Sequence, residues 1–194
     1  MKIIDKFLTE NDYTRPPGRK IAEKRAVILH WVGVPRQKAP AVWDYFEHGC
    51  AGKIYASAHY CIDLDGTVYR FIPDDSVAYH CGSSQIDPQS GKIYTDWARA
   101  IFGKYAKEPK RNSPNNAAIG IEMCVLDAEG NFAAETLQAA VELTAYLCKT
   151  YQIPIERVGT HNMVVGWKDC PRLWTRYPDK FEDFKKEVIG LLNG

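Results

Sequence analysis

Ala117-Ala118-Ile119-Gly120-Ile121-Glu122-Met123-Cys124-Val125-Leu126 is the stretch of this 194-residue chain that decides its fold. Its apolar character is continuous except at one position, which is typical of a central strand in a covered sheet. Glu122 is that exception, and a charge in such a strand needs a partner or a function. We therefore predict a central strand over residues 117–126 and treat Glu122 as a candidate site residue.

Two further regions predict strands that would join this one. The apolar run Val27-Ile28-Leu29-His30-Trp31-Val32 is rich in β-branched residues and predicts a buried strand with an imidazole near its end. Residues 57–64 and 67–72 predict a hairpin, because Asp65-Gly66 between them is a pair typical of a type I′ turn. Residues 77–82 predict another short segment at the edge of the sheet.

Helices are predicted between and after these strands, three of them from apolar spacing at three and four residues. The predicted ranges are 40–49, about 95–105, 134–151 and a last helix through 181–191. Strands paired by a hairpin and mixed with helices indicate an α/β fold, with a central mixed β-sheet flanked by helices. A three-layer arrangement and a simpler α+β variant both fit this pattern.

Length and composition favour one domain covering residues 1–194, because 45% of the residues are hydrophobic and 25% are charged. Within it we assign residues 1–24 to an N-terminal arm and residues 83–116, rich in Ser, Gly, Pro and Lys, to a surface insertion. Lys plus Arg number 25 and Asp plus Glu 24, so no strong field attracts anionic partners. We expect neither nucleic acid nor membrane as a partner, and the oligomeric state stays open.

The first ten residues interrupt their apolar positions with charges, so they form neither a signal-peptide core nor a membrane-spanning helix. We expect the chain to be made in the cytoplasm without a signal peptide. The six cysteines include no Cys-x-x-Cys pair, which disfavours a structural zinc knuckle and a disulfide framework. We interpret all of them except Cys170 as buried thiols.

Three residues far apart in the sequence, His30, His161 and Cys170, are candidate ligands of a catalytic zinc ion. His161 and Cys170 are nine residues apart (170 − 161) in a segment, 160–171, whose irregular composition predicts a loop with a flexible Gly166. Two imidazoles and one thiolate leave the fourth position of tetrahedral zinc open for water. The spacing alone is a weak signal, and His30 could instead cap its strand through backbone hydrogen bonds.

Glu122 and Lys168 each have a structural and a catalytic interpretation. Glu122 is either a core carboxylate satisfied by backbone or histidine donors, or a general base beside a zinc-activated water. Lys168 is by default a solvated loop lysine. If Cys170 is a ligand, however, the Lys168 ammonium can face the oxyanion that forms when water attacks a carbonyl.

Substrate contacts are less sharply indicated. His59 and His80 could orient metal ligands, contact substrate or be ordinary polar residues. Aromatic residues near the candidate site suit a groove that stacks on sugar rings, although core packing is the commoner role for each; they are Trp31, Tyr60, Tyr79, Trp167 and Trp174. Our candidate substrate-binding residues are His59, His80, Tyr60, Trp31 and Trp167.

Five blocks of the sequence, in order, resemble the zinc-dependent N-acetylmuramoyl-L-alanine amidases of type 2. This family includes phage endolysins, bacterial anhydro-muropeptide amidases and animal peptidoglycan-recognition proteins. The resemblance runs from about residue 25 to residue 173. Its blocks are residues 27–30, 57–60 leading to 65–68, 78–82, 118–122 and 160–171.

The resemblance implies a peptidoglycan hydrolase that cleaves the amide between N-acetylmuramic acid and L-alanine. It implies one zinc ion per chain, held by His30, His161 and Cys170. It also implies Glu122 as the general base and Lys168 as the group that stabilises the transition state. Bacterial peptidoglycan would be the partner, and the protein would act on the cell wall after release from the cytoplasm.

The chain departs from the family pattern in two places. Some members carry a catalytic tyrosine where this chain has Ala58, and Tyr60, on the same face of an extended strand, could substitute in part. The segment 83–116 is longer than in compact phage enzymes, and we expect it to border the substrate groove. Cys170 favours a phage or prophage endolysin, because recycling amidases generally carry aspartate there.

Three alternatives remain at this point. The chain could be a peptidoglycan-binding module without catalysis, although such modules typically lack the cysteine ligand. It could be a cytosolic muropeptide-recycling amidase. It could also be a catalytic fragment of a longer protein.

Overall fold

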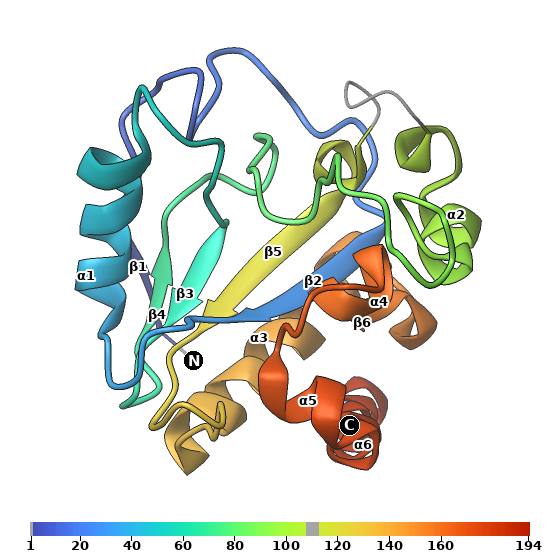
Figure 1. Cartoon of the computed structure of the whole chain (residues 1–194). Coiled ribbons are helices and arrows are strands. Elements are labelled where there is room, and N and C mark those ends of the chain that lie inside the picture. Colours follow the sequence, from blue (N-terminus) through green and yellow to red (C-terminus); the bar gives the residue numbers. More distant parts are fainter. Residues whose placement is uncertain (1, 108–112) are drawn as a thin grey trace.

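The computed structural model describes residues 2–107 and 113–194, which form a mixed sheet with helices on both faces (Figure 1). The strand order is β1-β4-β3-β5-β2-β6. The strands are β1 (Ile3–Asp5), β2 (Ala26–Trp31), β3 (Tyr60–Ile62), β4 (Val68–Arg70), β5 (Ala118–Met123) and β6 (Val158–Thr160). In this sheet β3 and β4 pair antiparallel and the other neighbours pair parallel, so the predicted mixed sheet is confirmed.

The predicted helices are present. The helix predicted at 40–49 is α1 (Ala39–Asp44) followed by the π-helical turn η1 (Tyr45–Cys50). The one predicted at 95–105 is α2 (Asp96–Phe102) followed by the 3-10 turn η2 (Gly103–Ala106). The two later helices are α3 (Ala134–Tyr151) and α6 (Pro178–Asn193). Shorter elements are α4 (His161–Val165), α5 (Arg172–Arg176), η4 (Pro114–Asn116) and η5 (Ile155–Arg157). None of the described helices has both the length and the apolar character needed to cross a membrane.

The central strands are apolar throughout because helices cover both of their faces. Val27 and Leu29 on β2 face the core shared with α3 and α6, together with Ile119 and Ile121 on β5. Ile28 belongs to the opposite core, which α2 and α4 cover. Side chains alternate along a strand, so His30 follows Ile28 onto this second face.

This second face carries two separate apolar clusters. One lies under α1 and includes Val42, Cys61 and Phe71, and the other lies under α2 and includes Ile28 and Phe102. Figure 1 shows α1 and α2 on opposite sides of the β2 and β5 strands. The polar ends of β2 and β5 lie between the two clusters, which is where a groove can form.

The predicted hairpin is present, but its turn is not type I′. Only Gly66 has a positive φ, of 78°, whereas type I′ needs positive φ at both central residues. Gly66 N donates to Asp63 O (3.1 Å), and the Asp65 carboxylate accepts from Thr67 N (2.9 Å). A Cβ on Gly66 would lie 2.8 Å from the Glu135 carbonyl oxygen, so packing against the start of α3 shapes this turn.

Two other local predictions are wrong. Residues 77–82 form no strand. They form a loop in which Tyr79 O accepts a hydrogen bond from Ser57 N (2.9 Å). The segment 160–171 is not entirely a loop, since it includes the end of β6 and the whole of α4. Thr160 caps α4 by accepting from Met163 N (3.2 Å), and this capping signal explains the helix.

The arm and the insertion both contribute to the folded core. Residues 1–24 supply β1, which pairs with β4 at the sheet edge, and the fully buried Leu8. Within 83–116, which we expected on the surface, Tyr94 and Phe102 are buried in the cluster under α2. The described part of this segment is therefore a covering layer of the sheet as well as a surface feature.

Candidate active site

The structure brings the three candidate metal ligands together. His30 lies on β2 and His161 begins α4 directly after β6, and these strands are parallel neighbours with Leu29 opposite Thr160. His161 Nδ1 is 3.1 Å from His30 Nδ1, and Cys170 Sγ is 3.8 Å from the same atom. All three ligand atoms lie within 4.8 Å of one another, and all three residues are buried.

These distances suit a zinc ion. Zinc binds imidazole nitrogen at about 2.0 Å and thiolate sulfur at about 2.3 Å, so a tetrahedral site separates its ligand atoms by roughly 3.3 to 3.6 Å. Two of the three observed separations, 3.1 Å and 3.8 Å, lie close to that range, and the third is within 4.8 Å. Two buried imidazole nitrogens facing each other beside a thiol form a donor set that a divalent cation would satisfy.

Hydrogen bonds around His80 define which nitrogen of His30 is free. The Ala118 carbonyl can only accept, so His80 donates to it from Nε2 (3.3 Å). His80 Nδ1 then accepts from His30 Nε2 (3.0 Å), which leaves the lone pair of His30 Nδ1 pointing toward His161 and Cys170. Burial lowers the pKa of His80 to about 3 and that of His30 well below its ordinary value, so both rings are neutral.

Glu122 lies beside this cluster because it is paired with His30 in the β2–β5 register. Its Oε2 atom is buried and has no hydrogen-bond partner among the described residues. Burial raises the pKa of Glu122 to about 8, although the positive charge of Lys168 opposes this rise. A core carboxylate satisfied by neighbouring donors does not fit these facts, whereas a carboxyl awaiting a ligand does.

Lys168 is exposed and lines the same groove as Glu122. Its loop is held to α4, because the Asn162 side chain donates to Lys168 O (2.9 Å) and Asn162 N donates to Cys170 O (2.9 Å). Burial raises the pKa of the Cys170 thiol to about 12. A metal would therefore have to displace the thiol proton in order to bind the sulfur.

The groove has a volume of about 1300 Å³ and is lined by the metal candidates, Glu122 and Lys168. Of our candidate substrate-binding residues, it includes His80 and Trp31 and leaves out His59, Tyr60 and Trp167. Trp167 packs at the edge of the cluster under α2 instead. The groove also contains Arg19 and Tyr55, which we did not predict because neither belongs to a strand or a recognisable motif.

His59 is a structural residue in this arrangement. It is completely buried, its Nδ1 accepts from Gly120 N (3.0 Å) and its Nε2 donates to Ser76 O (2.9 Å). Both ring nitrogens are thus used within the protein. The position of His59 does not support a contact with substrate.

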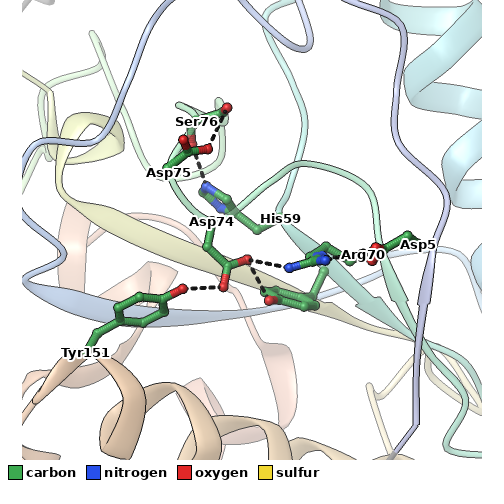
Figure 2. A network of polar contacts seen from close by, with 8 residues as sticks. Asp5, His59, Arg70, Asp74, Asp75, Ser76 and Tyr151 are labelled. Atoms are coloured by element: carbon green, nitrogen blue, oxygen red, sulfur yellow. Dashed lines mark hydrogen bonds and ion pairs between the residues drawn. The ribbon is translucent and has the colours of Figure 1, made fainter.

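Tyr60 faces away from the groove. It is completely buried in the core under α3, where its hydroxyl donates to Asp74 Oδ1 (2.6 Å) and the Tyr151 hydroxyl donates to Asp74 Oδ2 (2.7 Å). Figure 2 shows Asp74 between Tyr151 and Arg70. Residues 57–59 precede β3, so the rule that i and i+2 share a face does not hold between Ala58 and Tyr60. The position of Tyr60 does not support the prediction that it substitutes for a tyrosine at position 58.

A family model described as N-acetylmuramoyl-L-alanine amidase matches residues 18–173, the part of the chain that carries all of these site residues. The chain belongs to the N-acetylmuramoyl-L-alanine amidase family. The predicted family is therefore confirmed. Amidases of this type are typically zinc-dependent, which agrees with the possible metal site formed by His30, His161 and Cys170.

Two relatives from bacilli extend this family assignment. The chain is similar to "Probable N-acetylmuramoyl-L-alanine amidase" of Bacillus licheniformis, with 34% identity over 193 residues that cover 99% of this chain and 48% of the relative. It is 30% identical over 189 residues to the N-acetylmuramoyl-L-alanine amidase BlyA of Bacillus subtilis (strain 168), and the match covers 97% of this chain and 47% of the relative. The chain spans about half the length of these curated relatives.

Solved structures share the fold. PlyL superimposes with a TM-score of 0.68 at 22% identity, covering 97% of each chain. The PlyG catalytic domain superimposes with a TM-score of 0.70 at 20% identity, and the match covers 99% of this chain and 96% of that one. A mutant endolysin from Bacillus subtilis gives 0.67 at 23% identity, covering 97% and 99%. The predicted amidase fold is confirmed.

Proposed function

We propose that this chain is a peptidoglycan hydrolase that cleaves the amide between N-acetylmuramic acid and L-alanine, using one zinc ion. The observation that carries the proposal is the buried cluster of His30, His161 and Cys170 beside the unpartnered Oε2 atom of Glu122. Membership of the amidase family supports the substrate class. The groove above the cluster is large enough for a muropeptide-sized ligand.

In this proposal His30, His161 and Cys170 hold the zinc ion, which would polarise the attacking water and the substrate carbonyl. Glu122 takes the proton of that water and returns it to the leaving amine of L-alanine. Burial raises the pKa of Glu122 to about 8 in the metal-free protein, and the charge of a bound ion would lower it toward neutral pH, where the carboxyl can both accept and donate a proton. The Lys168 ammonium faces the carbonyl oxygen as negative charge develops on it.

The test is Glu122→Gln, which keeps the shape of the side chain and removes its basicity. We expect about one zinc ion per chain in both proteins and a loss of about 100-fold or more in kcat for the variant. Glu156→Gln is the control, because Glu156 is exposed and lies outside the groove. Full activity in Glu122→Gln would refute its role as base.

The products distinguish this activity from others. An amidase releases new L-alanine amino termini from purified cell walls and creates no new reducing sugar ends. New reducing ends would indicate a glycosidase instead. A binding module without catalysis would adsorb to the walls and release neither product.

Within the amidases, we propose that the chain acts as a phage or prophage endolysin. A cysteine rather than an aspartate in the ligand set supports this choice, as does an endolysin among the similar structures. The protein would be made in a bacterial cytoplasm and reach the wall after release. Faster cleavage of intact sacculi than of soluble muropeptides is expected; the opposite ratio would favour a recycling amidase.

A further inference from the structure

Arg19 brings a positive charge from the N-terminal arm into the groove. Its backbone is fixed on both sides, since Arg19 N donates to Pro16 O (3.3 Å) and Val77 N donates to Arg19 O (3.0 Å). The second bond joins the arm to the loop that carries Tyr79 and His80. Arg19 is therefore attached to the same loop that orients His30.

The guanidinium group is also fixed, but only by neutral acceptors. Nη1 donates to the Tyr79 hydroxyl (3.0 Å) and Nη2 donates to Asn116 Oδ1 (2.8 Å). A guanidinium group has five N–H donors, so three remain for a ligand. The group is exposed to the groove rather than covered by these neighbours.

Within the described residues, no carboxylate forms an ion pair with Arg19. Other arginines that are tied into the fold do have acidic partners: Arg15 with Glu10, Arg25 with Glu23, Arg70 with Asp5 and Arg172 with Asp169. Arg19 is instead a pre-positioned cation whose charge is not neutralised by an ion pair. A planar guanidinium group with free donors binds a carboxylate in a two-pronged geometry.

Aromatic rings border this cation. Tyr79, whose ring lies 5.8 Å from the Arg19 guanidinium carbon, contacts the ring of Tyr55 edge-on with centroids 5.3 Å apart. Both tyrosines line the groove with Arg19. Apolar rings beside a charge reduce the screening by water and strengthen its attraction for an anion.

We propose that Arg19 binds a free carboxylate of the stem peptide and makes the enzyme select stems whose carboxylates are free over stems in which they are amidated. This inference rests on the proposed function, because it takes a muropeptide as the occupant of the groove. The contribution of Lys168 is separate, since Lys168 lies on the Cys170 loop and, in the proposed function, faces the reacting carbonyl.

The experiment uses two soluble muropeptides that differ only in whether the stem carboxylates are free or amidated. For the unmodified protein we expect kcat/KM to favour the free form by about tenfold, the value of one charged hydrogen-bonded contact. In Arg19→Gln this ratio should fall toward one through a rise in KM for the free form. Arg19→Lys should keep part of the preference, because it keeps the positive charge but loses the two-pronged hydrogen-bonding geometry of the guanidinium group.

Lys20→Gln is the matched control. It removes one positive charge from the adjacent residue, which pairs with Asp75 (2.8 Å) and lies outside the groove. We expect this variant to keep the unmodified protein's preference for the muropeptide with free carboxylates. If Arg19→Gln kept the unmodified protein's preference for the free form, or raised KM equally for both muropeptides, the proposal would be overturned.

Binding measured by calorimetry separates this inference from the proposed activity. If the protein cleaves neither muropeptide, the amidase proposal fails, yet the dissociation constants of the two muropeptides still report on Arg19. A weaker Kd for the free form alone in Arg19→Gln supports the carboxylate contact. Unchanged affinities for both forms would reject it.

Discussion

His59 makes the stability of the fold depend on pH. In the folded protein its Nδ1 lone pair accepts from Gly120 N, so the ring cannot be protonated there without losing that bond. Burial lowers its pKa from 6.5 to about 4. Because the folded-state pKa is depressed, the stabilisation is complete above pH 6.5 and is lost as pH falls toward 4.

We therefore expect the unfolding free energy of the metal-free protein to fall by ~3 kcal/mol over this range on account of His59 alone. Urea denaturation at pH 7 and at pH 4 measures the difference. His59→Asn, whose amide can still accept from Gly120 N but does not titrate in this range, should reduce it. His48→Asn changes an exposed histidine and should leave it as it is. Equal pH dependence in His59→Asn would contradict the assignment.

Gly120 gives His80 room beside β5. A Cβ at position 120 would lie 2.5 Å from His80 Cγ, so Gly120→Ala must displace the ring that orients His30. We expect zinc affinity, measured by competition with a chelator, to fall about tenfold or more. Stability should fall by about 1 to 3 kcal/mol.

The control for this change is Gly190→Ala in α6, where an added Cβ meets nothing within 4 Å. It should leave zinc affinity intact and stabilise the protein by roughly 0.5 to 1 kcal/mol. Unaltered zinc affinity in Gly120→Ala would mean that His80 does not position His30.

At this scale the sequence predicts best the residues placed by a strand. His30 and Glu122 share a face because adjacent parallel strands put them in register, and alternation along a strand is a local rule. Tyr60 was placed on the same face as Ala58 by this rule, and it lies on the other face of the sheet. The backbone at 57–59 is not in a strand. His59 is hydrogen-bonded to Ser76 and Tyr60 to Asp74, and both partners lie in a loop whose path the sequence pattern does not indicate.

At the scale of elements, α2 is attached to α4 through its N-cap residue, Thr95. The Thr95 hydroxyl accepts from Ala98 N (3.2 Å) as a helix cap and donates to Met163 O in α4. Thr95→Ala removes both bonds and should lower the unfolding free energy by about 1 to 2 kcal/mol. Thr95→Ser keeps the hydroxyl and should therefore recover most of the lost unfolding free energy, which thermal denaturation measures. Equal losses in the two variants would show that the hydroxyl is not responsible.

Elements were predictable where a periodic apolar face was long. The prediction of α3 over 134–151 matches its observed bounds, because eighteen residues repeat the pattern of one buried stripe. The five residues of α4 are too few to show such a pattern, and only the Thr160 cap signals the helix. The hairpin turn depended on packing against Glu135, a contact between segments about 70 residues apart.

At the scale of the whole molecule, the sheet order brings distant segments together at one edge. β2 lies between β5 and β6, so His30 meets Glu122 on one side and His161 on the other. The apolar content of the strands predicts that they are central, but it does not specify which strands are neighbours. The resemblance to a family implied that His30, His161 and Cys170 share one site, but the order of the strands was not predicted.

Metal binding should link this sheet edge to the rest of the fold. His161 and Cys170 are 131 and 140 residues from His30, so one ion would connect β2, α4 and the loop after it. A ligand that binds only the folded state stabilises it by ~4 kcal/mol when its free concentration is 1,000 times Kd. We therefore expect a higher Tm with zinc than with a chelator, measured by scanning calorimetry.

The thiol makes this prediction specific. Because the pKa of Cys170 is about 12 in the metal-free protein, zinc binding must release about one proton from it near neutral pH. Titration calorimetry in two buffers of different ionisation enthalpy measures that proton. Cys170→Ser should lose the proton release and most of the zinc-dependent rise in Tm. Cys148→Ser, a change of a cysteine in α3 outside the cluster, should keep both. An unchanged zinc response in Cys170→Ser would show that the sulfur is not a ligand.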